Sequence, residues 1–147
     1  VKTFWSNGYV ENTGTLLKGL KEEDWEYFHD NGKLRAKGSY IKGKKSGKWL
    51  TYFNNGNMRS EEVYDKGKKA GVWAFYYRSG NIRTEEEYKN NKLEGIWKFY
   101  LESGELMESG FQKNGQRDGL LEIFDKSGDL IKRETWAMGV LKKVELY

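Results

Sequence analysis

The chain has 147 residues, a formal net charge of +4 and a pI near 9.0. It has no cysteine and a single histidine, which excludes disulfides, thiolate catalysis and any metal site built from several histidines or cysteines. Proline is absent and 16% of the residues are aromatic, so the composition is that of a folded chain rather than a disordered one. No apolar run reaches the ~18 residues of a transmembrane helix.

A 24-residue period runs from one end of the chain to the other. An aromatic residue precedes each glycine of the first series by four positions, and an aliphatic residue or methionine follows it by two. The members of this series are Gly8, Gly32, Gly56, Gly80, Gly104 and Gly128.

A second series keeps the same spacing, with asparagine at one position. Asparagine is the usual substitute for glycine where φ is positive, so Asn91 fits the series. The members are Gly19, Gly43, Gly67, Asn91, Gly115 and Gly139. Only the fifth copy departs, where Phe111 comes one residue early and predicts an added residue before Gly119.

Each copy contains two short runs rich in aromatic and β-branched residues, which predicts a β-hairpin. Asp30-Asn31-Gly32-Lys33 and its equivalents favour a type I turn with a glycine bulge. The second turn, 42–47, is expected to be longer and more basic. The copies are 1–22 (partial), 23–46, 47–70, 71–94, 95–118 and 119–147.

These hairpins predict an all-β fold, an elongated single-layer antiparallel meander in one repeat array over 1–147. Two strands per copy at ~4.8 Å each advance the sheet by about 10 Å, so the ribbon is on the order of 55 Å long. Apolar columns on both faces predict that the sheet twists or curves into a trough.

The facing of the side chains depends on the hairpin loop. A three-residue loop places Phe28 opposite Leu34, with Tyr40 on that side and Trp25 and Tyr27 on the other. A two-residue loop instead groups Trp25, Tyr27 and Leu34. The sequence leaves both registers open, and with them the choice of buried face.

Two sets of residues are candidates for binding. The first is an aromatic ladder that packs neighbouring copies together and offers any exposed part to a protein partner: Trp25, Trp49, Trp73, Trp97, Tyr40, Tyr64 and Tyr88. The second is a basic margin at the second turns, which either aids solubility or attracts anionic lipid or an acidic partner: Lys42, Lys44, Lys45, Lys66, Lys68, Lys69, Lys89 and Lys92.

The segments 47–56 and 71–80, Gly-Lys-Trp-Leu-Thr-Tyr-Phe-Asn-Asn-Gly and Gly-Val-Trp-Ala-Phe-Tyr-Tyr-Arg-Ser-Gly, resemble the bacterial variant of the MORN repeat. The resemblance covers about 4–143 and weakens after Gly104. It implies side-by-side hairpins in a curved sheet. Similar repeats occur in proteins of the antitoxin type and beside the kinase domain of phosphatidylinositol-phosphate kinases, so the resemblance implies binding to a protein, such as a toxin, or to phosphoinositides.

No catalytic motif is present: a P-loop, a kinase signature and a paired acid and base are all missing. The acidic runs 61–62 and 85–87 read as solvated strand positions paired with Lys or Arg. We therefore expect a non-enzymatic binding or scaffold protein that needs no cofactor or metal.

The leading expectation is a protein partner, and the alternative is an anionic membrane surface. Nucleic acid is disfavoured because the aromatic residues and lysines are not interleaved on one surface. The exposed sheet ends predict weak end-to-end self-association. The chain begins at Val1 without methionine, so we expect that the natural N-terminus is missing, and a cytoplasmic or envelope location stays open.

Overall fold

A computed structural model describes residues 1–147. It shows one 14-stranded antiparallel sheet in which successive strands lie side by side, with β7 attached to β6. The strands are β1 (Lys2–Phe4), β2 (Val10–Leu17), β3 (Leu20–Phe28), β4 (Leu34–Ile41), β5 (Lys44–Tyr52), β6 (Met58–Asp65), β7 (Lys68–Lys69), β8 (Gly71–Tyr76), β9 (Ile82–Lys89), β10 (Lys92–Tyr100), β11 (Leu106–Lys113), β12 (Gln116–Phe124), β13 (Leu130–Ala137) and β14 (Val140–Leu146).

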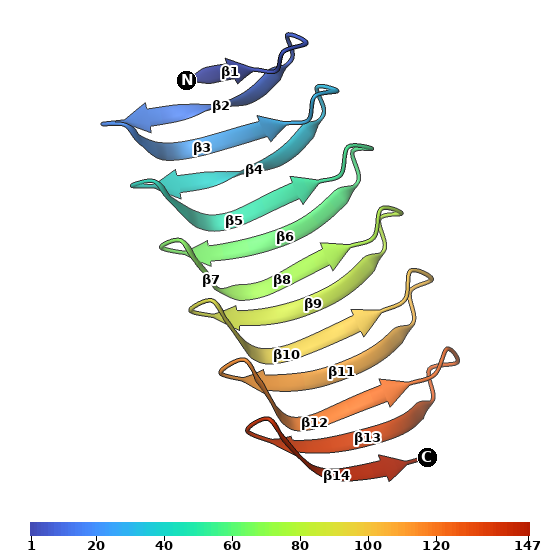
Figure 1. Ribbon diagram of the computed structural model, residues 1–147. Coiled ribbons are helices and arrows are strands. Elements are labelled where there is room, and N and C mark those ends of the chain that lie inside the picture. The colour runs from blue at the N-terminus through green and yellow to red at the C-terminus, as the bar shows by residue number, and fades with distance from the viewer.

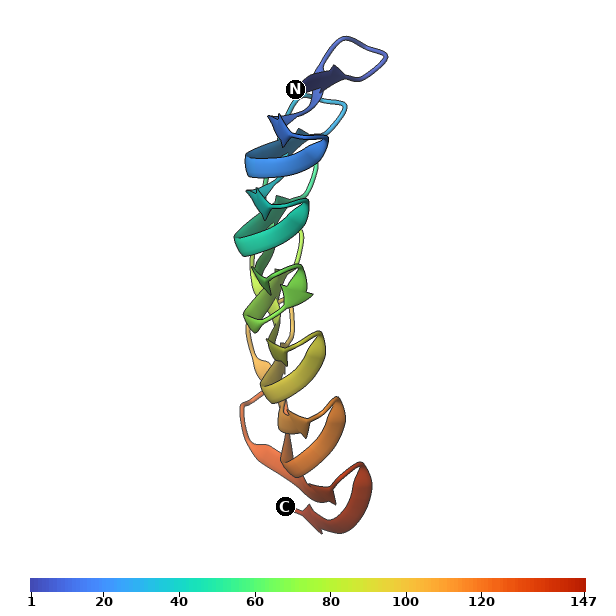
Figure 2. The ribbon, with the colours of Figure 1, turned by 90° about the vertical axis from the view of Figure 1, so that its left-hand side faces the viewer.

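The sheet is a long, single-layered ribbon with the chain termini at its two ends (Figure 1). β1 and β14 have a neighbour on one side only, so the sheet is open. Turned by 90°, the ribbon is narrow and its strands are curved across their width (Figure 2). The expected single-layer antiparallel meander of hairpins is therefore confirmed.

The turns of the first glycine series have the predicted geometry. The Gly32 N–H donates to the His29 carbonyl (2.9 Å), and the His29 N–H donates to the Lys33 carbonyl (2.8 Å). Gly32 has φ +79°, whereas Asp30 and Asn31 keep negative φ. This is a type I turn followed by a glycine bulge, as the sequence predicts.

The turns of the second series are shorter than expected. Ile41 pairs with Lys44, so only Lys42 and Gly43 form the loop, and both have positive φ (50° and 75°). Two positive φ angles define the type I′ turn, which suits the twist of a two-residue hairpin. The same conformation recurs at Asn90 and Asn91, and the φ of +69° at Asn91 confirms its place in the glycine series.

Gly47 was predicted to belong to the turn, but it lies inside β5 with φ +67°. The pairing register shifts there, between Lys37 and Ser39 on the neighbouring strand. A left-handed residue within a strand bends it, because the pleat cannot continue through that conformation. The same position has a positive φ in each copy, at Glu23, Gly47, Gly71, Gly95 and Gly119.

Two bulges per copy decide which side chains share a face. Phe28 pairs with Leu34, as the three-residue loop requires, but Tyr27 pairs with Ala36, which leaves Arg35 unpaired between them. This extra residue reverses the alternation along β4. The loop is the three-residue one of the two registers left open, but Tyr40 lies on the same side as Trp25 and not on the other side as that register implied; the centres of the two rings are 6.1 Å apart.

The predicted slip in the fifth copy was also wrong. Asn114 and Gly115 form the turn at the expected spacing, and Gly110 lies opposite Trp97, so no residue is added before Gly119. Gln112 takes the position that tyrosine holds in earlier copies. Phe111 belongs to the other face of the sheet.

Candidate interaction surfaces

The side of the sheet that carries the tryptophans, the aromatic face, is tightly packed. Trp25, Trp49 and Trp73 are only 1–3% exposed although the sheet is a single layer. They are buried because each ring lies against the adjoining strand. A Cβ added to Gly38 would collide with the ring of Trp49, and one added to Gly14 would collide with that of Trp25.

The buried indoles also donate hydrogen bonds to the main chain ten residues earlier. Trp25 donates to Thr15 (3.1 Å), Trp49 to Ser39 (3.1 Å) and Trp73 to Val63 (2.9 Å). Three of the four predicted ladder tryptophans are thus enclosed by their neighbours rather than exposed to solvent. What this face presents to solvent is its tyrosines and basic side chains.

Trp97 is the exception in this ladder. It is half-buried, and its indole N–H has no partner. The pairing of β10 with β9 skips from Leu93 to Trp97, and Gly95 has φ +135°. In the skipped segment, the Ile96 N–H donates to the Glu87 carboxylate (3.3 Å).

Two lysines assigned to the basic margin lie instead over the aromatic rings. Lys45 Nζ is 4.2 Å from the centre of the Trp49 ring and 4.7 Å from that of Tyr64. Lys69 lies 4.3 Å from Trp73 in the same way. Such cation–π contacts offset part of the hydration free energy that an ammonium group loses when it is partly buried.

A third member of this set was not predicted from the sequence. Lys21 Nζ is 4.4 Å from the Trp25 ring and donates to the Tyr27 hydroxyl (2.7 Å). It lies one period before Lys45, so the 24-residue spacing itself contained the signal. Leu93 takes this position beside Trp97, which therefore has no covering cation.

Carboxylates join the ladder where glycine is replaced. Tyr64 donates to Glu62 (2.8 Å), which lies 3.8 Å from Lys45 Nζ, and Tyr88 donates to Glu86 (2.6 Å). Burial and then the hydrogen bond to the carboxylate raise the pKa of both tyrosines far above its usual value. Burial lowers the pKa of Lys45, and Glu62 offsets part of that shift.

Glu61 and Glu85 follow the prediction of cross-strand pairing with lysine, whereas Glu86 and Glu87 form no ion pair. Glu61 forms an ion pair with Lys48, and Glu85 is 3.6 Å from Lys98. The Lys48 contact, with burial opposing it, lowers the pKa of Glu61. These pairs lie on the side of the sheet away from the tryptophans, which we call the opposite face.

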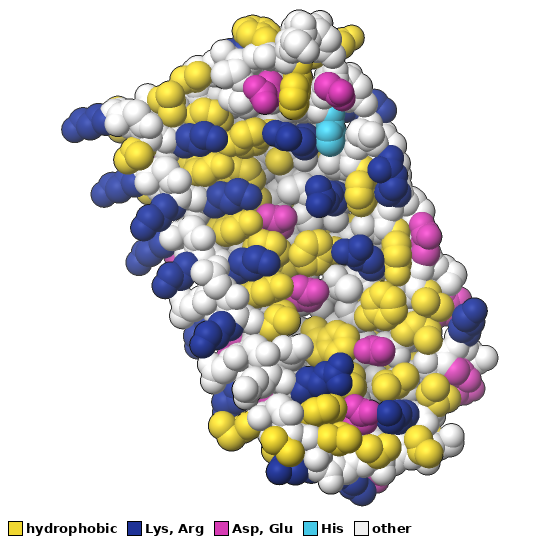
Figure 3. Space-filling model, viewed as in Figure 1, with side chains coloured by type: hydrophobic (Ala, Val, Ile, Leu, Met, Phe, Trp, Pro, Cys, Tyr) yellow, Lys and Arg dark blue, Asp and Glu magenta, His cyan; other side chains and the backbone are white.

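The basic margin runs along the type I′ turns. Six of the eight predicted lysines are exposed there: Lys42, Lys44, Lys66, Lys68, Lys89 and Lys92. Lys18 and Lys113 extend the row by one turn at each end. Basic side chains line the left-hand outline of the molecule in the upper repeats (Figure 3). Asp65 is an exposed acidic residue among them, and the Glu22 and Glu94 carboxylates accept hydrogen bonds from main-chain N–H groups of these turns.

The opposite face carries an exposed apolar stripe in the C-terminal half. Its side chains are 41–56% exposed, and Ile96 and Phe111 are directly paired across β10 and β11. The 24-residue spacing places one aliphatic residue on every second strand. The stripe consists of Val72, Ile96, Phe111 and Leu120.

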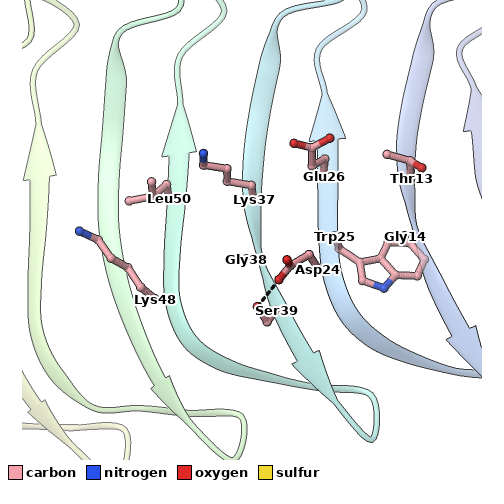
Figure 4. Close-up of a pocket in the computed structure, with 10 residues that line it drawn as sticks. All are labelled: Thr13, Gly14, Asp24, Trp25, Glu26, Lys37, Gly38, Ser39, Lys48 and Leu50. Carbon is pink, nitrogen blue, oxygen red and sulfur yellow. Dashed lines mark hydrogen bonds between the residues drawn. The ribbon is translucent and has the colours of Figure 1, made fainter.

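A polar hollow of about 520 Å³ occupies the N-terminal half of the same face. Gly14, Trp25 and Gly38 lie along its floor, and Glu26, Lys37 and Leu50 project from neighbouring strands around it (Figure 4). Ser39 donates to Asp24 (2.5 Å) within it. The carboxylates of the hollow, Asp24 and Glu26, come from β3, and its amines, Lys37 and Lys48, come from β4 and β5.

These features define an open β-hairpin repeat protein whose glycines set the turns and whose tryptophans join adjacent hairpins. The sequence profile of the MORN repeat variant matches four consecutive segments, 24–42, 45–66, 69–90 and 93–114, together more than half of the chain. The chain belongs to this family, as the resemblance in the sequence indicated. No curated protein matches the chain significantly. No helix in the structure has the length and hydropathy to cross a bilayer.

Proposed function

We propose that the chain is a non-catalytic binding module that presents one face of its rigid ribbon to a protein partner. The observation that carries this proposal is the apolar stripe of Val72, Ile96, Phe111 and Leu120. Single exposed apolar residues are ordinary on protein surfaces, but several gathered on one face favour an interface. Ile96 and Phe111 are direct neighbours in this stripe, and Glu87 lies between Val72 and Ile96.

The stripe is suited to contact because its strands are held from the other side. Trp73 is buried on the aromatic face directly behind Val72, since neighbouring residues of a strand point to opposite faces. Ile96 is held from the side, by its pairing with Phe111 of β11. The backbone of the stripe is therefore fixed within the sheet, and little conformational entropy of the backbone is lost when a partner covers it.

Capture of a protein from the cells in which the chain occurs tests the proposal. We expect a protein retained by the wild-type chain to be lost by Val72→Asn/Ile96→Asn/Leu120→Asn. The matched control is Leu17→Asn/Leu20→Asn, which also alters exposed aliphatic residues (58% and 50% exposed) but at the margin. Equal capture by both variants, or capture of nothing by wild type, would contradict the proposal.

The narrower proposal, that this partner is a toxin neutralised by the chain, rests on the resemblance to antitoxin-type repeat proteins. Its test is co-expression with a small growth-inhibiting protein encoded by a neighbouring gene. Growth restored by wild type and not by the stripe variant supports it. Growth arrest in both cases contradicts it.

The basic margin favours a second candidate function, binding to an anionic membrane surface. Lys42, Lys44, Lys66 and Lys68 extend from adjacent type I′ turns, so they can approach an anionic membrane together. Each such lysine contributes about 1 kcal/mol near a charged bilayer at low salt.

Vesicle flotation tests this second candidate. We expect binding to phosphatidylserine or phosphoinositide vesicles that disappears at high salt and in Lys42→Gln/Lys44→Gln/Lys66→Gln/Lys68→Gln. Lys21→Gln is the control, because that lysine is held over Trp25. Absence of binding at low salt would rule this function out.

A further inference from the structure

Three arginines form a ladder on the aromatic face: Arg35, Arg59 and Arg83. Each is the unpaired residue of the β-bulge that follows a glycine turn. Leu34, Met58 and Ile82 pair with residues of the opposite face, so the arginine that follows each of them lies on the aromatic face. The bulge then keeps the residue after the arginine on that same face. The guanidinium carbon of Arg35 lies 5.8 Å from the centre of the Tyr27 ring, which confirms that Arg35 lies on the aromatic face.

None of the three arginines forms an ion pair with a carboxylate of the chain. In contrast, Lys45 lies near Glu62, and Arg117 and Arg133 reach carboxylates within 4.0 Å. Basic side chains form two regular files in the upper repeats, on the face that shows the histidine (Figure 3). The arginine ladder therefore presents unneutralised donors at a fixed interval.

The interval follows from the topology. The arginines lie on β4, β6 and β9, which are successively two strands apart, so the step between them is about 10 Å. A polyproline II peptide advances ~3.1 Å per residue and has three residues per turn, so every third side chain lies on one side at a step of about 9 Å. The spacing of the three arginines is therefore close to the spacing of every third side chain of such a peptide.

The surface between two of the rungs is hollowed. Arg59 and Arg83 flank a depression of about 410 Å³ that Ser60, Glu62 and Phe75 also line. Ser60 is 2% exposed, shares a hydrogen bond with Thr51 (2.6 Å) and donates to the Glu62 carboxylate (2.8 Å), which also accepts from Tyr64. The depression thus offers an aromatic surface for a proline ring between two guanidinium groups, and the carboxylate within it is hydrogen-bonded to the chain's own hydroxyls.

We infer that the arginine ladder binds an acidic segment of a protein in the polyproline II conformation, with a carboxylate at every third residue. The segment lies along the array, across the strands, and each carboxylate accepts a bidentate hydrogen bond from one guanidinium. Because the extended conformation exists before binding, little conformational entropy is lost. The inference rests on the proposed function in that the segment belongs to a protein partner.

Fluorescence anisotropy with a labelled Glu-Pro-Pro repeat peptide of about 12 residues tests the inference. We expect saturable binding that weakens about tenfold in Arg35→Gln/Arg59→Gln/Arg83→Gln. The control is Lys42→Gln/Lys44→Gln/Lys66→Gln, which removes the same charge from the basic margin and should change the affinity less than about twofold. Circular dichroism and urea unfolding establish that both variants are folded.

The register is tested with a peptide of the same composition in which all glutamates precede all prolines. Weaker binding of this peptide supports the inference. Equal binding of the two peptides, equal losses in the two protein variants, or no binding of the repeat peptide would overturn it. Binding of phosphatidylserine vesicles through the same three arginines, with no preference for the peptide, would reassign the ladder to lipid.

The peptide-binding and protein-capture experiments separate an error in the arginine-ladder inference from an error in the proposed function. If the peptide does not bind but a captured protein is still lost in the stripe variant, the ladder inference alone is wrong. If the peptide binds and no protein depends on the stripe, the ladder stands as the binding surface and the stripe does not.

Discussion

The ring of Trp49 lies against Gly38 of the adjoining strand, and its indole N–H donates to the carbonyl of Ser39, the next residue (3.1 Å). This pair of contacts joins one hairpin to the next. In a single-layered sheet no second layer covers the core, so the rings must find their burial within the sheet. A glycine on the preceding strand provides that space for Trp25 and Trp49, and Glu62 takes the equivalent position before Trp73.

Gly38→Ala tests this packing. The added Cβ would meet the Trp49 ring at a distance that no real contact shows, so ring or strand must move. We expect a loss of about 1–3 kcal/mol in the free energy of unfolding, measured with urea. Lys37→Ala, on the exposed neighbour, should change it by less than about 0.5 kcal/mol. Equal stability of Gly38→Ala and wild type would contradict the packing.

Substitution by phenylalanine should lower the free energy of unfolding more at Trp49 than at Trp97. Trp49→Phe removes a buried hydrogen bond and leaves the Ser39 carbonyl without that donor, whereas the Trp97 N–H has no partner to lose. We expect Trp49→Phe to destabilise the chain by about 1 kcal/mol more than Trp97→Phe. The difference in urea midpoint measures this, and an equal or reversed order would refute the assignment.

The tyrosines predict a loss of stability at alkaline pH. Burial and then the Tyr27 hydroxyl raise the pKa of Tyr40 to about 12, and burial with the Glu85 hydrogen bond raises the pKa of Tyr100 to about 12. An unfolded tyrosine ionises near pH 10, so the folded state binds these protons more tightly. Their stabilisation is complete below pH 10 and is lost as the pH rises towards 12.

Thermal unfolding between about pH 9 and 11.5 measures this effect. We expect the melting temperature to fall across the range, and to fall less steeply in Tyr40→Phe/Tyr100→Phe. Phe99→Leu is the control, since it alters a neighbouring ring without a hydroxyl. A double variant with an unchanged alkaline slope would show that these tyrosines do not carry the dependence.

The end strand β14 predicts self-association of the 147-residue chain. One edge of β14 has no strand partner, and Leu141, Val144 and Leu146 are exposed along it. Such an edge can pair with another chain. We expect the apparent mass in sedimentation equilibrium to rise with concentration, and to stay monomeric in Leu141→Lys/Leu146→Lys. A wild-type mass independent of concentration would contradict this prediction.

Much of the fold could be predicted because its turns require particular residue types. The left-handed positions need glycine or asparagine, and Asn91 was recognised by that rule. The period then placed Trp25, Trp49 and Trp73 in one column, and that column is the core. The family profile matches the same repeats.

The arrangement of the faces could not be predicted in the same way. Each bulge adds one residue and reverses the alternation beyond it, so Tyr40 changed sides relative to the simple register, whereas Arg35 did not. Whether a glycine such as Gly47 ends a strand or bends it depends on the neighbouring strand. Lys45 lies over Trp49 because the loop ends at Gly43 and Lys45 is already a strand residue paired with Tyr40, which a count of lysines in turns could not reveal.

Small-angle X-ray scattering tests the central claim, an open ribbon of hairpins, most directly. Thirteen strands in succession at ~4.8 Å make an array about 60 Å long, which gives a monomer radius of gyration of about 20 Å. A compact domain of 147 residues would have about 15 Å. A value near 20 Å at low concentration, with a pair-distance distribution extending past about 60 Å, is the predicted result, and a value near 15 Å with a symmetric distribution would contradict it.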